Sequence, residues 1–540
     1  MAQGSGSCTG LGGGDTGLSE RSEILQRLGE QGEPWDVVVI GGGASGLGAA
    51  VEAASRGYRT VLVERFDFAK GTSSRSTKLV HGGVRYLEQF NITLVMDALR
   101  ERGHMLRNAP HLVHNLQFVV PAFDYFSLPY YGFGLKVYER MSGRLSLGAS
   151  KLLSRERTVE MLPGIADSGL RGGILYHDGQ FDDARYAISL LRTFQDLGGI
   201  AVNYVEAVGL LKRDGKIVGI RARDCEEDVQ FDLQAKVVVN ASGVFTEEVL
   251  AMDGVAAESL LAVSQGTHFV LPHSFLPGST ALMIPKTADG RVLFAIPWHE
   301  STIVGTTDVP VNGASVEPRS MAEERTFLLD HIARYFGRRP RAEEIQSMWS
   351  GLRPLVRKGG GGKTSKLSRD HTILVSKSGL VTVTGGKWTT YRRMGEDTIN
   401  HAAEVAGFAK MASRTLDLKL HGWTDSSGGI AESDRVYGAD LPLLQSLSDN
   451  DAALGALLHP RLPYRLREVV WAVRYEMART VEDVLARRTR ALFLDARAAI
   501  EAAPAVADLL AKELGRSDAW RDKDLQRFVD LANGYIYRDE

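Results

Sequence analysis

The sequence predicts a mixed α/β protein: a Rossmann-like unit interleaved with an antiparallel sheet, followed by an all-helical C-terminal domain. A strand, a glycine turn, a helix and a second strand follow one another between Trp35 and Glu64. Short apolar runs between residues 263 and 306 predict the strands of a second sheet. Beyond about residue 412, apolar residues recur at helical spacing, as in Leu466 to Leu494.

The composition is that of a soluble globular protein large enough for several domains. Of its 540 residues, 44% are apolar and 24% are charged, and the formal net charge is -2. This balance gives no argument for a nucleic-acid partner. The only cysteines are Cys8 and Cys225, so we expect neither a disulfide framework nor a metal site. No apolar run reaches 18 residues, which predicts no membrane span, and residues 1–34 are expected to form a flexible extension.

The first strand, expected at residues 36–40, leads into a glycine motif of the kind that binds dinucleotides. Gly41 allows a tight turn, Gly43 lets the backbone approach a pyrophosphate, and Gly46 lets helix and strand pack closely. The following helix begins with free N–H groups and a positive dipole end. The next strand ends on Glu64, whose carboxylate is placed to accept hydrogen bonds from a ribose diol. The cofactor contacts predicted in this unit are Gly41, Gly43, Ala44, Ser45, Gly46 and Glu64.

A hydroxyl-rich segment, residues 72–78, follows the second strand and precedes the sequence His81-Gly82-Gly83. Hydroxyl groups at this density suit a loop that lies against a diphosphate, although a solvated Ser/Thr loop has the same composition. A helix is expected after it, over residues 93–108. The cofactor contacts predicted here are Thr72, Ser73, Ser76, Lys78, His81, Gly82 and Gly83.

Later strands return the chain to the first sheet. Residues 202–213 and 216–222 predict a hairpin that turns at Asp214-Gly215. The apolar strand 236–240 leads into Ala241-Ser242-Gly243, and the strand 380–384 leads into Gly385-Gly386-Lys387. Because the second sheet lies between these two strands, the layout resembles the superfamily of FAD-dependent amine and hydroxy-acid oxidases. The cofactor contacts predicted here are Gly243, Gly386, Lys387 and Thr389.

Six further motifs follow one another in order within residues 36 to 400. They are Ser76–Leu87, Gly266–His268, Ile303–Asp308, Ser350–Leu355, Ser368–His371 and Gly385–Arg392. Taken together, they resemble the FAD-dependent, quinone-linked (aerobic-type) glycerol-3-phosphate dehydrogenase family. The resemblance implies a protein that oxidises sn-glycerol 3-phosphate to dihydroxyacetone phosphate with FAD and passes the electrons to a membrane quinone.

The resemblance also implies a division into domains. Residues 35–410 are expected to hold the FAD-binding unit, mainly at 35–110, 170–262 and 365–410. The same stretch holds the antiparallel substrate-binding unit, mainly at 111–169 and 263–364. Residues 411–540 are expected to form the helical domain, for which the sequence leaves three roles open: covering the site, contacting a second copy in a homodimer, or contacting a membrane.

Site residues follow from the same resemblance. Arg353 and Arg369 are the expected phosphate clamps, since a guanidinium group matches phosphate oxygens bidentately. His268 is the candidate base for the hydroxyl proton. Lys387 is expected to hold the substrate or to stabilise negative charge on the reduced flavin. The catalytic set is therefore His268, Arg353 and Lys387, and the substrate-binding set is Arg85, Tyr86, Arg353 and Arg369.

Residues 123–138 contain seven aromatic side chains in 16 positions, with Lys136 and Arg140 beside them. Aromatic rings with flanking cations favour a membrane–water interface, and the edge of an ordinary core is the equal alternative. Because no membrane span is predicted and the resemblance implies a membrane quinone, the expected location is cytoplasmic, peripheral on the inner face of the cytoplasmic membrane. Arg487, Arg488 and Arg490 are expected on a solvated helix face, with lipid contact as the lesser alternative.

Three other functions remain open from the sequence. An oxidase acting on the same substrate would pass its electrons to oxygen and form hydrogen peroxide. An amine or amino-acid oxidase of the same superfamily would bind a carboxylate and show no preference for phosphate. A flavin-binding protein without turnover would leave the arginine clamps unexplained.

Overall fold

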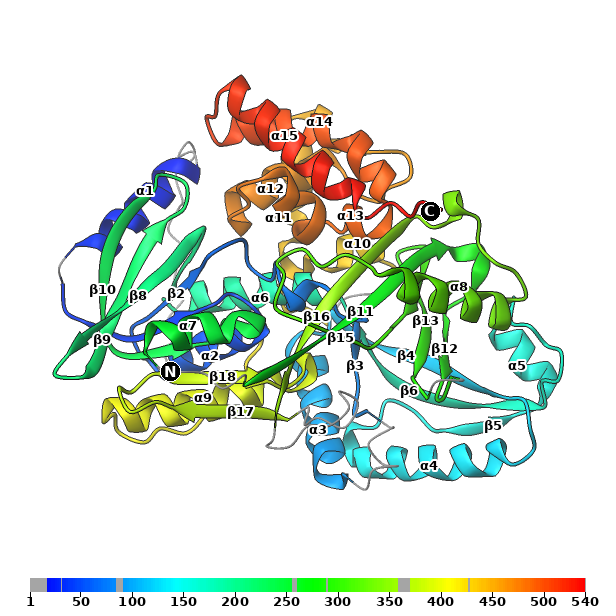
Figure 1. Ribbon diagram of the computed structural model, residues 1–540. Coiled ribbons are helices and arrows are strands. Elements are labelled where there is room, and N and C mark those ends of the chain that lie inside the picture. The colour runs from blue at the N-terminus through cyan, green and yellow to red at the C-terminus, as the bar shows by residue number, and fades with distance from the viewer. Residues whose placement is uncertain are drawn as a thin grey trace, which may run out of the picture.

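The computed structural model describes residues 17–30, 32–83, 91–254, 260–287, 290–357, 370–425 and 428–539. Two sheets lie side by side, and a helical domain covers one end of both (Figure 1). This confirms the predicted fold class.

The first sheet has a parallel centre in the order β18-β10-β1-β2-β7, with β17 antiparallel at one edge and the β8–β9 hairpin joined to β10. Its central strands are short, apolar runs buried on both faces, as parallel strands usually are. The strands are β1 (Trp35–Ile40), β2 (Thr60–Glu64), β7 (Ile200–Asn203), β8 (Val205–Arg213), β9 (Lys216–Asp224), β10 (Val229–Asn240), β17 (His371–Val375) and β18 (Val381–Gly385).

Helices cover both faces of the first sheet. On one face α2 (Ala44–Ser55), α6 (Asp183–Asp196) and α9 (Tyr391–Ala406) share a single core with β1 and β18. The helices α2 and α9 approach closely because both carry glycine at the contact: a Cβ on Gly395 would lie 2.5 Å from the Gly48 carbonyl oxygen. The other face packs against α1 (Gly17–Gly29), α7 (Thr246–Met252) and the hairpin.

Among the described residues, the second sheet has ten strands in the order β15-β11-β14-β13-β12-β4-β6-β3, with β16 paired to β11 and β5 to β6. One face packs against α5 (Arg155–Met161) and α8 (Ala322–Phe336), and α4 (Ser127–Ser142) covers part of the other, beside α3 (Ile92–Asn108). The strands are β3 (Leu79–Val80), β4 (Val113–Ala122), β5 (Lys151–Leu153), β6 (Gly172–Phe181), β11 (Leu261–Pro272), β12 (Thr280–Ile284), β13 (Leu293–Trp298), β14 (Ser301–Gly305), β15 (Val309–Val311) and β16 (Ser347–Val356).

One boundary differs from the expected division. Residues 172–181 fall within the stretch assigned mainly to the FAD-binding unit, but they form β6 of the second sheet. The reason is that β6 pairs with β4 along its whole length, from Gly172 opposite Ala122 to Phe181 opposite Val113. The chain returns to the first sheet only at β7, after α6.

The helical domain lies over the ends of both sheets (Figure 1). Its apolar core continues into the second sheet through Trp298, Ile303 and Trp349. Within the described residues its helices are α10 (Glu432–Arg435), α11 (Leu441–Asn450), α12 (Leu466–Glu476), a π-helix (Asp483–Arg488), α13 (Ala491–Leu494), α14 (Ala496–Glu513) and α15 (Asp518–Asn533).

Candidate functional site

A cavity of about 750 Å³ lies between the two sheets and receives side chains from both. That volume is in the range of cofactor and ligand pockets. At one end it meets the glycine turn of β1 and α2, and at the other it meets one face of the second sheet. Most of the predicted contacts line it: Gly41, Gly43, Ala44, Ser45, Glu64, Thr72, Ser73, Ser76, His81, Gly83, Gly243, His268, Arg353, Gly386, Lys387 and Thr389.

The glycine turn leaves no room for side chains. Gly41 has φ +109°, a backbone conformation that favours glycine, and a Cβ there would lie 2.6 Å from the Ala241 carbonyl oxygen. A Cβ on Gly46 would lie 1.8 Å from the Gly41 carbonyl oxygen. Gly46 therefore acts through the packing of α2 on the turn, as the sequence predicts, and does not itself line the cavity.

The N-terminus of α2 faces the cavity and is not capped by its own N-cap side chain, because that residue is Gly43. The Ala44 N–H instead donates to the Ser73 hydroxyl oxygen at 2.9 Å. Ser73 is in turn fixed by Trp388, whose indole N–H donates to its carbonyl oxygen at 2.9 Å. A helix N-terminus flanked by a hydroxyl group suits a diphosphate.

Glu64 closes the nucleotide end of the cavity. Its carboxylate accepts hydrogen bonds from the Gly42 N–H at 2.6 Å and the Phe66 N–H at 2.8 Å. Burial raises the pKa of Glu64 above its usual value, against these two bonds, which lower it. Because a carboxylate has about four acceptor sites, it retains capacity for a ribose diol. The turn, the helix end and this carboxylate together fit the pyrophosphate and ribose of FAD.

Arg353, on β16, is placed at the opposite end by a glycine on the neighbouring strand. Its guanidinium group donates to the Thr306 hydroxyl oxygen at 3.0 Å and to the Thr307 carbonyl oxygen at 3.1 Å. Asp308 lies 3.5 Å from the guanidinium group and also accepts a hydrogen bond from Ser264, so it braces the arginine. A Cβ on Gly266 would lie 2.2 Å from an Arg353 guanidinium nitrogen.

His268 is buried between Trp349 and the backbone of Gly305. The imidazole stacks on the indole at 4.0 Å between ring centroids, and a Cβ on Gly305 would lie 2.2 Å from its Cδ2. Its Nε2 lies 3.0 Å from the Thr77 hydroxyl oxygen, and Nδ1 is buried with no hydrogen-bond partner among the described residues. Burial, followed by the charges of Lys78 and Arg353, lowers the pKa of His268 well below its usual value. The ring is therefore neutral at neutral pH.

The last strand of the first sheet brings in the remaining contacts. β18 ends at Gly385, and Gly386 has φ +80°, which turns the chain into the cavity wall. Lys387 follows at the start of a short 3-10 helix (Trp388–Thr390). The Thr389 hydroxyl oxygen accepts from the His81 N–H at 3.3 Å, which ties this turn to the segment after β3.

Besides Gly46, two predicted cofactor contacts, Lys78 and Gly82, do not line the cavity. The Lys78 ammonium is fully buried and binds the Asp183 carboxylate at 2.7 Å and the Ser74 carbonyl oxygen at 2.8 Å. Burial lowers the pKa of Lys78 to about 7, although Asp183 favours the charged form. This ion pair braces the loop, so the prediction of a direct contact was wrong. The Gly82 N–H donates to the Tyr138 hydroxyl oxygen at 2.7 Å, and Gly82 lies outside the cavity lining.

Three predicted substrate contacts, Arg85, Tyr86 and Arg369, lie outside the described residues. Thr77 and Thr306 line the cavity but were not singled out from the sequence. Both belong to motifs in which other residues were predicted as contacts. Thr77 lies beside His268 and Thr306 beside Arg353 because distant parts of the chain meet, which no local sequence pattern reports.

The arginines expected on a solvated helix face are buried, which corrects that prediction. Arg487 and Arg488 both bind the Asp67 carboxylate, each at 2.5 Å, and Arg490 lies 3.2 Å from Asp183. The first two belong to a π-helix that ends at Arg488. Buried ion pairs thereby join the helical domain to the nucleotide-binding unit. Helical periodicity in the sequence cannot reveal them, because the carboxylates that pair with these arginines lie far away along the chain.

Comparison with known protein families gives two matches. The model described as "FAD dependent oxidoreductase" matches residues 36–392, and "C-terminal domain of alpha-glycerophosphate oxidase" matches residues 430–521.

Named relatives cover most of the chain. The mitochondrial glycerol-3-phosphate dehydrogenase of Homo sapiens is 38% identical over 537 residues, covering 93% of this chain and 73% of that protein. The probable mitochondrial glycerol-3-phosphate dehydrogenase of Caenorhabditis elegans is 39% identical over 551 residues, covering 96% and 76%.

Among solved structures, the glycerol-3-phosphate dehydrogenase of Bacillus halodurans complexed with FAD has a TM-score of 0.79 and 27% identity, covering 97% of this chain and all of that chain. The L-alpha-glycerophosphate oxidase of Mycoplasma pneumoniae, with a TM-score of 0.54 and 16% identity, covers 72% of this chain and 98% of that chain and shows likeness of fold alone.

Proposed function

The chain belongs to the family of FAD-dependent glycerol-3-phosphate dehydrogenases, and from this membership we propose that it oxidises sn-glycerol 3-phosphate to dihydroxyacetone phosphate and passes the electrons to a membrane quinone. The observation that carries the proposal is the cavity itself. It joins a dinucleotide cradle at Gly41, Gly43 and Glu64 to an end that holds Arg353 and His268.

Arg353 supplies the grip on phosphate in this proposal. Its guanidinium group faces the cavity and is held by Thr306, Thr307 and Asp308, so that little side-chain entropy remains to be lost on binding. A dianionic phosphate accepts hydrogen bonds from a guanidinium group more strongly than the neutral Thr306 hydroxyl and Thr307 carbonyl oxygens that already bind Arg353.

Oxidation of a secondary alcohol removes a hydride and a proton. When bound, FAD supplies the hydride acceptor. We assign the proton to His268, which is neutral at neutral pH and therefore able to accept it. Because Nε2 lies against Thr77 and Nδ1 is buried, the proton reaches the ring through the Thr77 hydroxyl group.

Anaerobic spectroscopy tests the cofactor and the substrate together. We expect the visible absorbance of bound flavin to bleach on addition of sn-glycerol 3-phosphate and to persist on addition of glycerol, which lacks the phosphate. Bleaching by amino acids alone would transfer the protein to the amino-acid oxidases of the superfamily. Absence of any flavin band after FAD is added would contradict the cofactor site.

Oxygen is the second candidate acceptor, because the match to residues 430–521 is described after an oxidase. The rate at which the substrate-reduced flavin is reoxidised distinguishes a quinone acceptor from oxygen. The quinone proposal expects slow reoxidation in air and fast reoxidation by a soluble quinone. Fast reoxidation in air with one hydrogen peroxide formed for each substrate would make the protein an oxidase.

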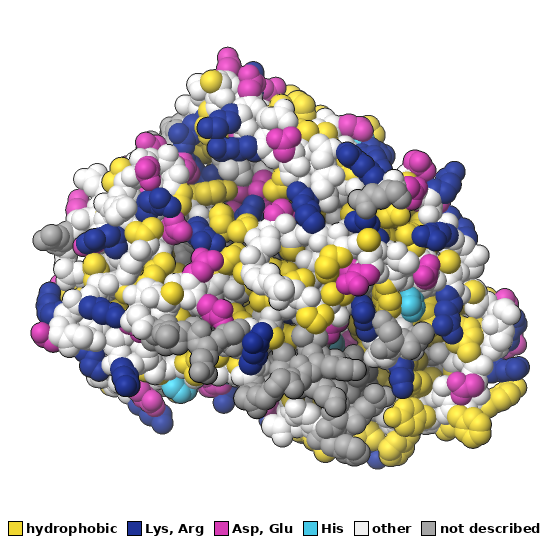
Figure 2. All heavy atoms as spheres, in the orientation of Figure 1, with side chains coloured by type: hydrophobic (Ala, Val, Ile, Leu, Met, Phe, Trp, Pro, Cys, Tyr) yellow, Lys and Arg dark blue, Asp and Glu magenta, His cyan; other side chains and the backbone are white. Residues whose placement is uncertain are grey.

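A quinone acceptor requires contact with a membrane, and we propose that α4 provides it from the cytoplasmic side. No helix within the described residues is long and apolar enough to cross a membrane. On and beside α4, however, Phe126 is 87% exposed, Phe133 75% and Tyr130 62%. Figure 2 shows hydrophobic side chains gathered at the lower right, over α4. Exposed aromatic rings beside Lys136 and Arg140 suit the headgroup region of a bilayer.

A further inference from the structure

The second sheet forms one wall of the cavity, and the side chains of this wall change from polar to mainly apolar across neighbouring strands. Pairing places His268 opposite Gly305, Gly305 opposite Phe294, and Phe294 opposite Met283. Directly paired residues share one face of a sheet, so these four lie in a row across β11, β14, β13 and β12. Phe118 and Tyr176, which pair with each other on β4 and β6, continue the same wall.

The far end of this wall is mainly apolar and aromatic, although Asp178, two residues from Tyr176 on β6, also lines the cavity. Phe118 stacks on Tyr176 with 5.1 Å between ring centroids, and it meets Phe294 edge-on at 6.2 Å. Phe294 in turn lies 6.5 Å from the His81 ring. We call this end the apolar arm; its lining side chains are Leu79, Phe118, Tyr176, Met283, Val292 and Phe294.

The proposed substrate does not account for the apolar arm. Neighbouring strands lie about 4.8 Å apart, so Phe294, two strands from His268, is about 10 Å away and β4 is about 19 Å away. A three-carbon phosphate bound between Arg353 and His268 does not reach that far. It also has no apolar surface that would benefit from six hydrophobic side chains.

We propose that the apolar arm binds the ring of the quinone that reoxidises the flavin. This rests on the quinone acceptor of the proposed function and names where on this chain it binds. A quinone ring is flat and apolar, with two carbonyl oxygens as its only polar groups. The stacked rings of the apolar arm provide flat surfaces for it.

Tyr176 supplies a donor for one carbonyl oxygen. Its hydroxyl group donates to the Met283 sulfur at 2.9 Å, and a thioether is a weak acceptor. Exchanging that bond for one to a carbonyl oxygen is favourable. Burial raises the pKa of Tyr176 well above its usual value, so the hydroxyl group keeps its proton and remains a donor.

The redox balance needs no further reactant. Hydride transfer leaves the flavin with two electrons and one proton more than its oxidised form, and the substrate hydroxyl group releases the second proton. A quinone takes up two electrons and two protons to become a quinol, so the electrons and protons balance. The hydrogen bond from Tyr176 orients the ring and is not consumed.

The apolar arm adjoins the helix proposed to contact the membrane. Its own side chains form one cluster with the inner face of α4, where Leu135 is buried and Leu128 and Tyr131 are partly buried. The outer face of α4 carries the exposed aromatic residues. The apolar arm therefore lies in the same side-chain cluster as the helix proposed to contact the membrane.

Two variants test the site in the FAD-loaded protein. Tyr176→Phe removes only the hydroxyl group, and Val292→Trp fills the arm from its half-buried side. With duroquinone as acceptor, we expect Tyr176→Phe to raise KM about fivefold, the loss of one hydrogen bond, and Val292→Trp to abolish saturation. Reduction of flavin by substrate and turnover with ferricyanide should be unchanged. Val229→Trp, at an exposed position on β10, is the matched control and should behave as the parent.

Binding provides a readout that does not depend on turnover. An azido derivative of the quinone should label peptides from β4, β6 or β13, and Val292→Trp should remove the label. Labelling of the C-terminal helices instead, or an unchanged duroquinone KM in both variants, would overturn the proposal. So would loss of FAD from Val292→Trp, which would assign the arm to the flavin ring. Failure of the proposed function is distinguishable, because flavin would then not be reduced by sn-glycerol 3-phosphate at all.

Discussion

Glycines decide where the two reactive side chains of the cavity can lie. The Arg353 guanidinium group passes over Gly266, and the His268 ring rests against Gly305, at positions that any Cβ would occupy. A Cβ on Gly351 would likewise lie 2.9 Å from the Cβ of Arg75. The space beside each of these three glycines is filled by another residue, so a larger side chain does not fit there. This requirement for glycine is what makes the motifs around residues 266, 305 and 351 recognisable in the sequence.

Replacement of Arg353 by alanine should weaken substrate binding by tenfold or more, since a charged hydrogen bond contributes about 1.5–3 kcal/mol. The measurement is the KM for sn-glycerol 3-phosphate together with the rate of flavin reduction. Arg353→Lys keeps the charge but loses the planar fork, and should recover only part of the affinity. An unchanged KM in Arg353→Ala would remove this residue from the substrate site.

Thr77→Val should slow flavin reduction by about 100-fold, the lower limit for a lost proton transfer, while FAD remains bound. Thr77→Ser retains the hydroxyl group and should recover most of the rate. Stopped-flow reduction across pH is the measurement, and the decline in rate that we expect for the parent at acid pH should vanish in the valine variant. If valine leaves both rate and pH profile unchanged, the substrate proton does not pass through Thr77.

At the scale of elements, α4 is held on one side and exposed on the other. Its Tyr138 hydroxyl group donates to Asp178 at 2.7 Å and is buried, whereas Tyr130 and Phe133 point to solvent. Tyr131, which belongs to the same aromatic stretch of residues 123–138, is partly buried in the cluster that includes the apolar arm. It is therefore a poor choice for testing surface contact.

Replacing Phe126, Tyr130 and Phe133 together by serine should release the protein from vesicles, because burial of each ring contributes about 25 cal/mol per Å². Sedimentation with anionic vesicles is the measurement, with flavin reduction as a check on folding. A matched control replaces Leu443 and Leu457, which are exposed in the helical domain, by serine and should leave binding intact. Equal loss in both variants would show that the effect is not specific to α4.

At the scale of the whole molecule, buried charges join the helical domain to the nucleotide-binding sheet. Burial alone would raise the pKa of Asp67, but Arg488 and Arg487 outweigh it and hold the pKa below its usual value. Arg185 forms a second link, binding Glu476 of α12 at 2.7 Å. Together with Trp349, which packs on Phe493 behind His268, these contacts make the helical domain a support for the back of the site.

Asp67→Asn should lower the free energy of unfolding by about 3–5 kcal/mol, because it leaves buried arginine charge with too few partners. Thermal unfolding of the FAD-loaded protein is the measurement. The double variant Asp67→Leu with Arg488→Met removes both members of one pair and should be less destabilised than the single variant. A melting temperature equal to the parent's in Asp67→Asn would mean that the pair contributes nothing.

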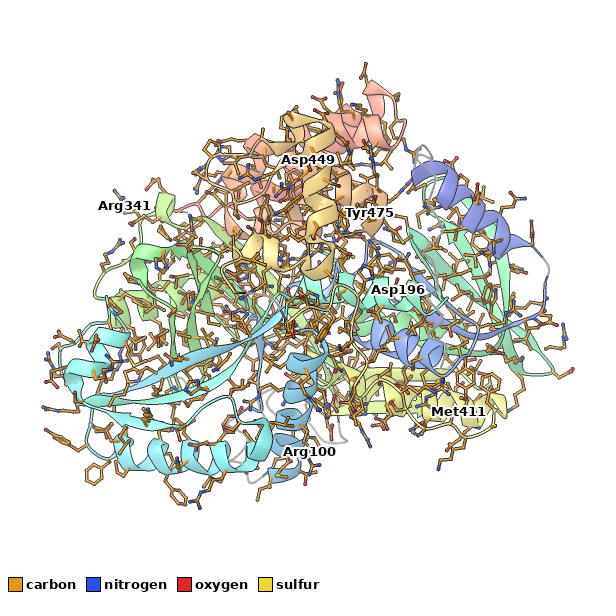
Figure 3. All side chains as sticks on the ribbon, turned by 180° about the vertical axis from the view of Figure 1, so that it is seen from behind. Arg100, Asp196, Arg341, Met411, Asp449 and Tyr475 are labelled. Atoms are coloured by element: carbon orange, nitrogen blue, oxygen red, sulfur yellow. The ribbon has the colours of Figure 1, made fainter. Side chains whose placement is uncertain are left out.

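A further contact between the helical domain and the first sheet involves a histidine that titrates above neutral pH. His421 binds Asp196 at 2.6 Å and Asp440 at 2.8 Å, and Asp196 lies on the back of the molecule below Tyr475 of the helical domain (Figure 3). Burial alone would lower the pKa of His421, but these carboxylates raise it from 6.5 to about 9.

A raised pKa in the folded state means that the folded protein keeps a proton that the unfolded chain releases. The contribution of His421 is therefore complete below pH 6.5 and is lost as the pH rises to about 9. At pH 6 we expect His421→Gln to be less stable than the parent by about 1–2 kcal/mol, allowing for partial solvent screening. Near pH 9.5 the two should converge; a difference independent of pH would exclude this titration.

The sequence by itself determined the features that depend on neighbouring residues. The turn at Gly41–Gly46, the carboxylate at Glu64 and the alternation of strands with helices are local, because each depends on backbone conformation or on apolar periodicity within one segment. The resemblance of the motifs added the family, and with it FAD, which the comparisons confirm.

Only the tertiary structure decided which distant residues meet. Thr77 reaches His268 across 191 positions of sequence, and Arg488 reaches Asp67 across 421. The apolar arm is assembled from β3, β4, β6, β12 and β13, none of which has an unusual sequence by itself. Strand pairing and the docking of a whole domain set these contacts, and burial then turns ordinary serines, threonines and arginines into parts of a site.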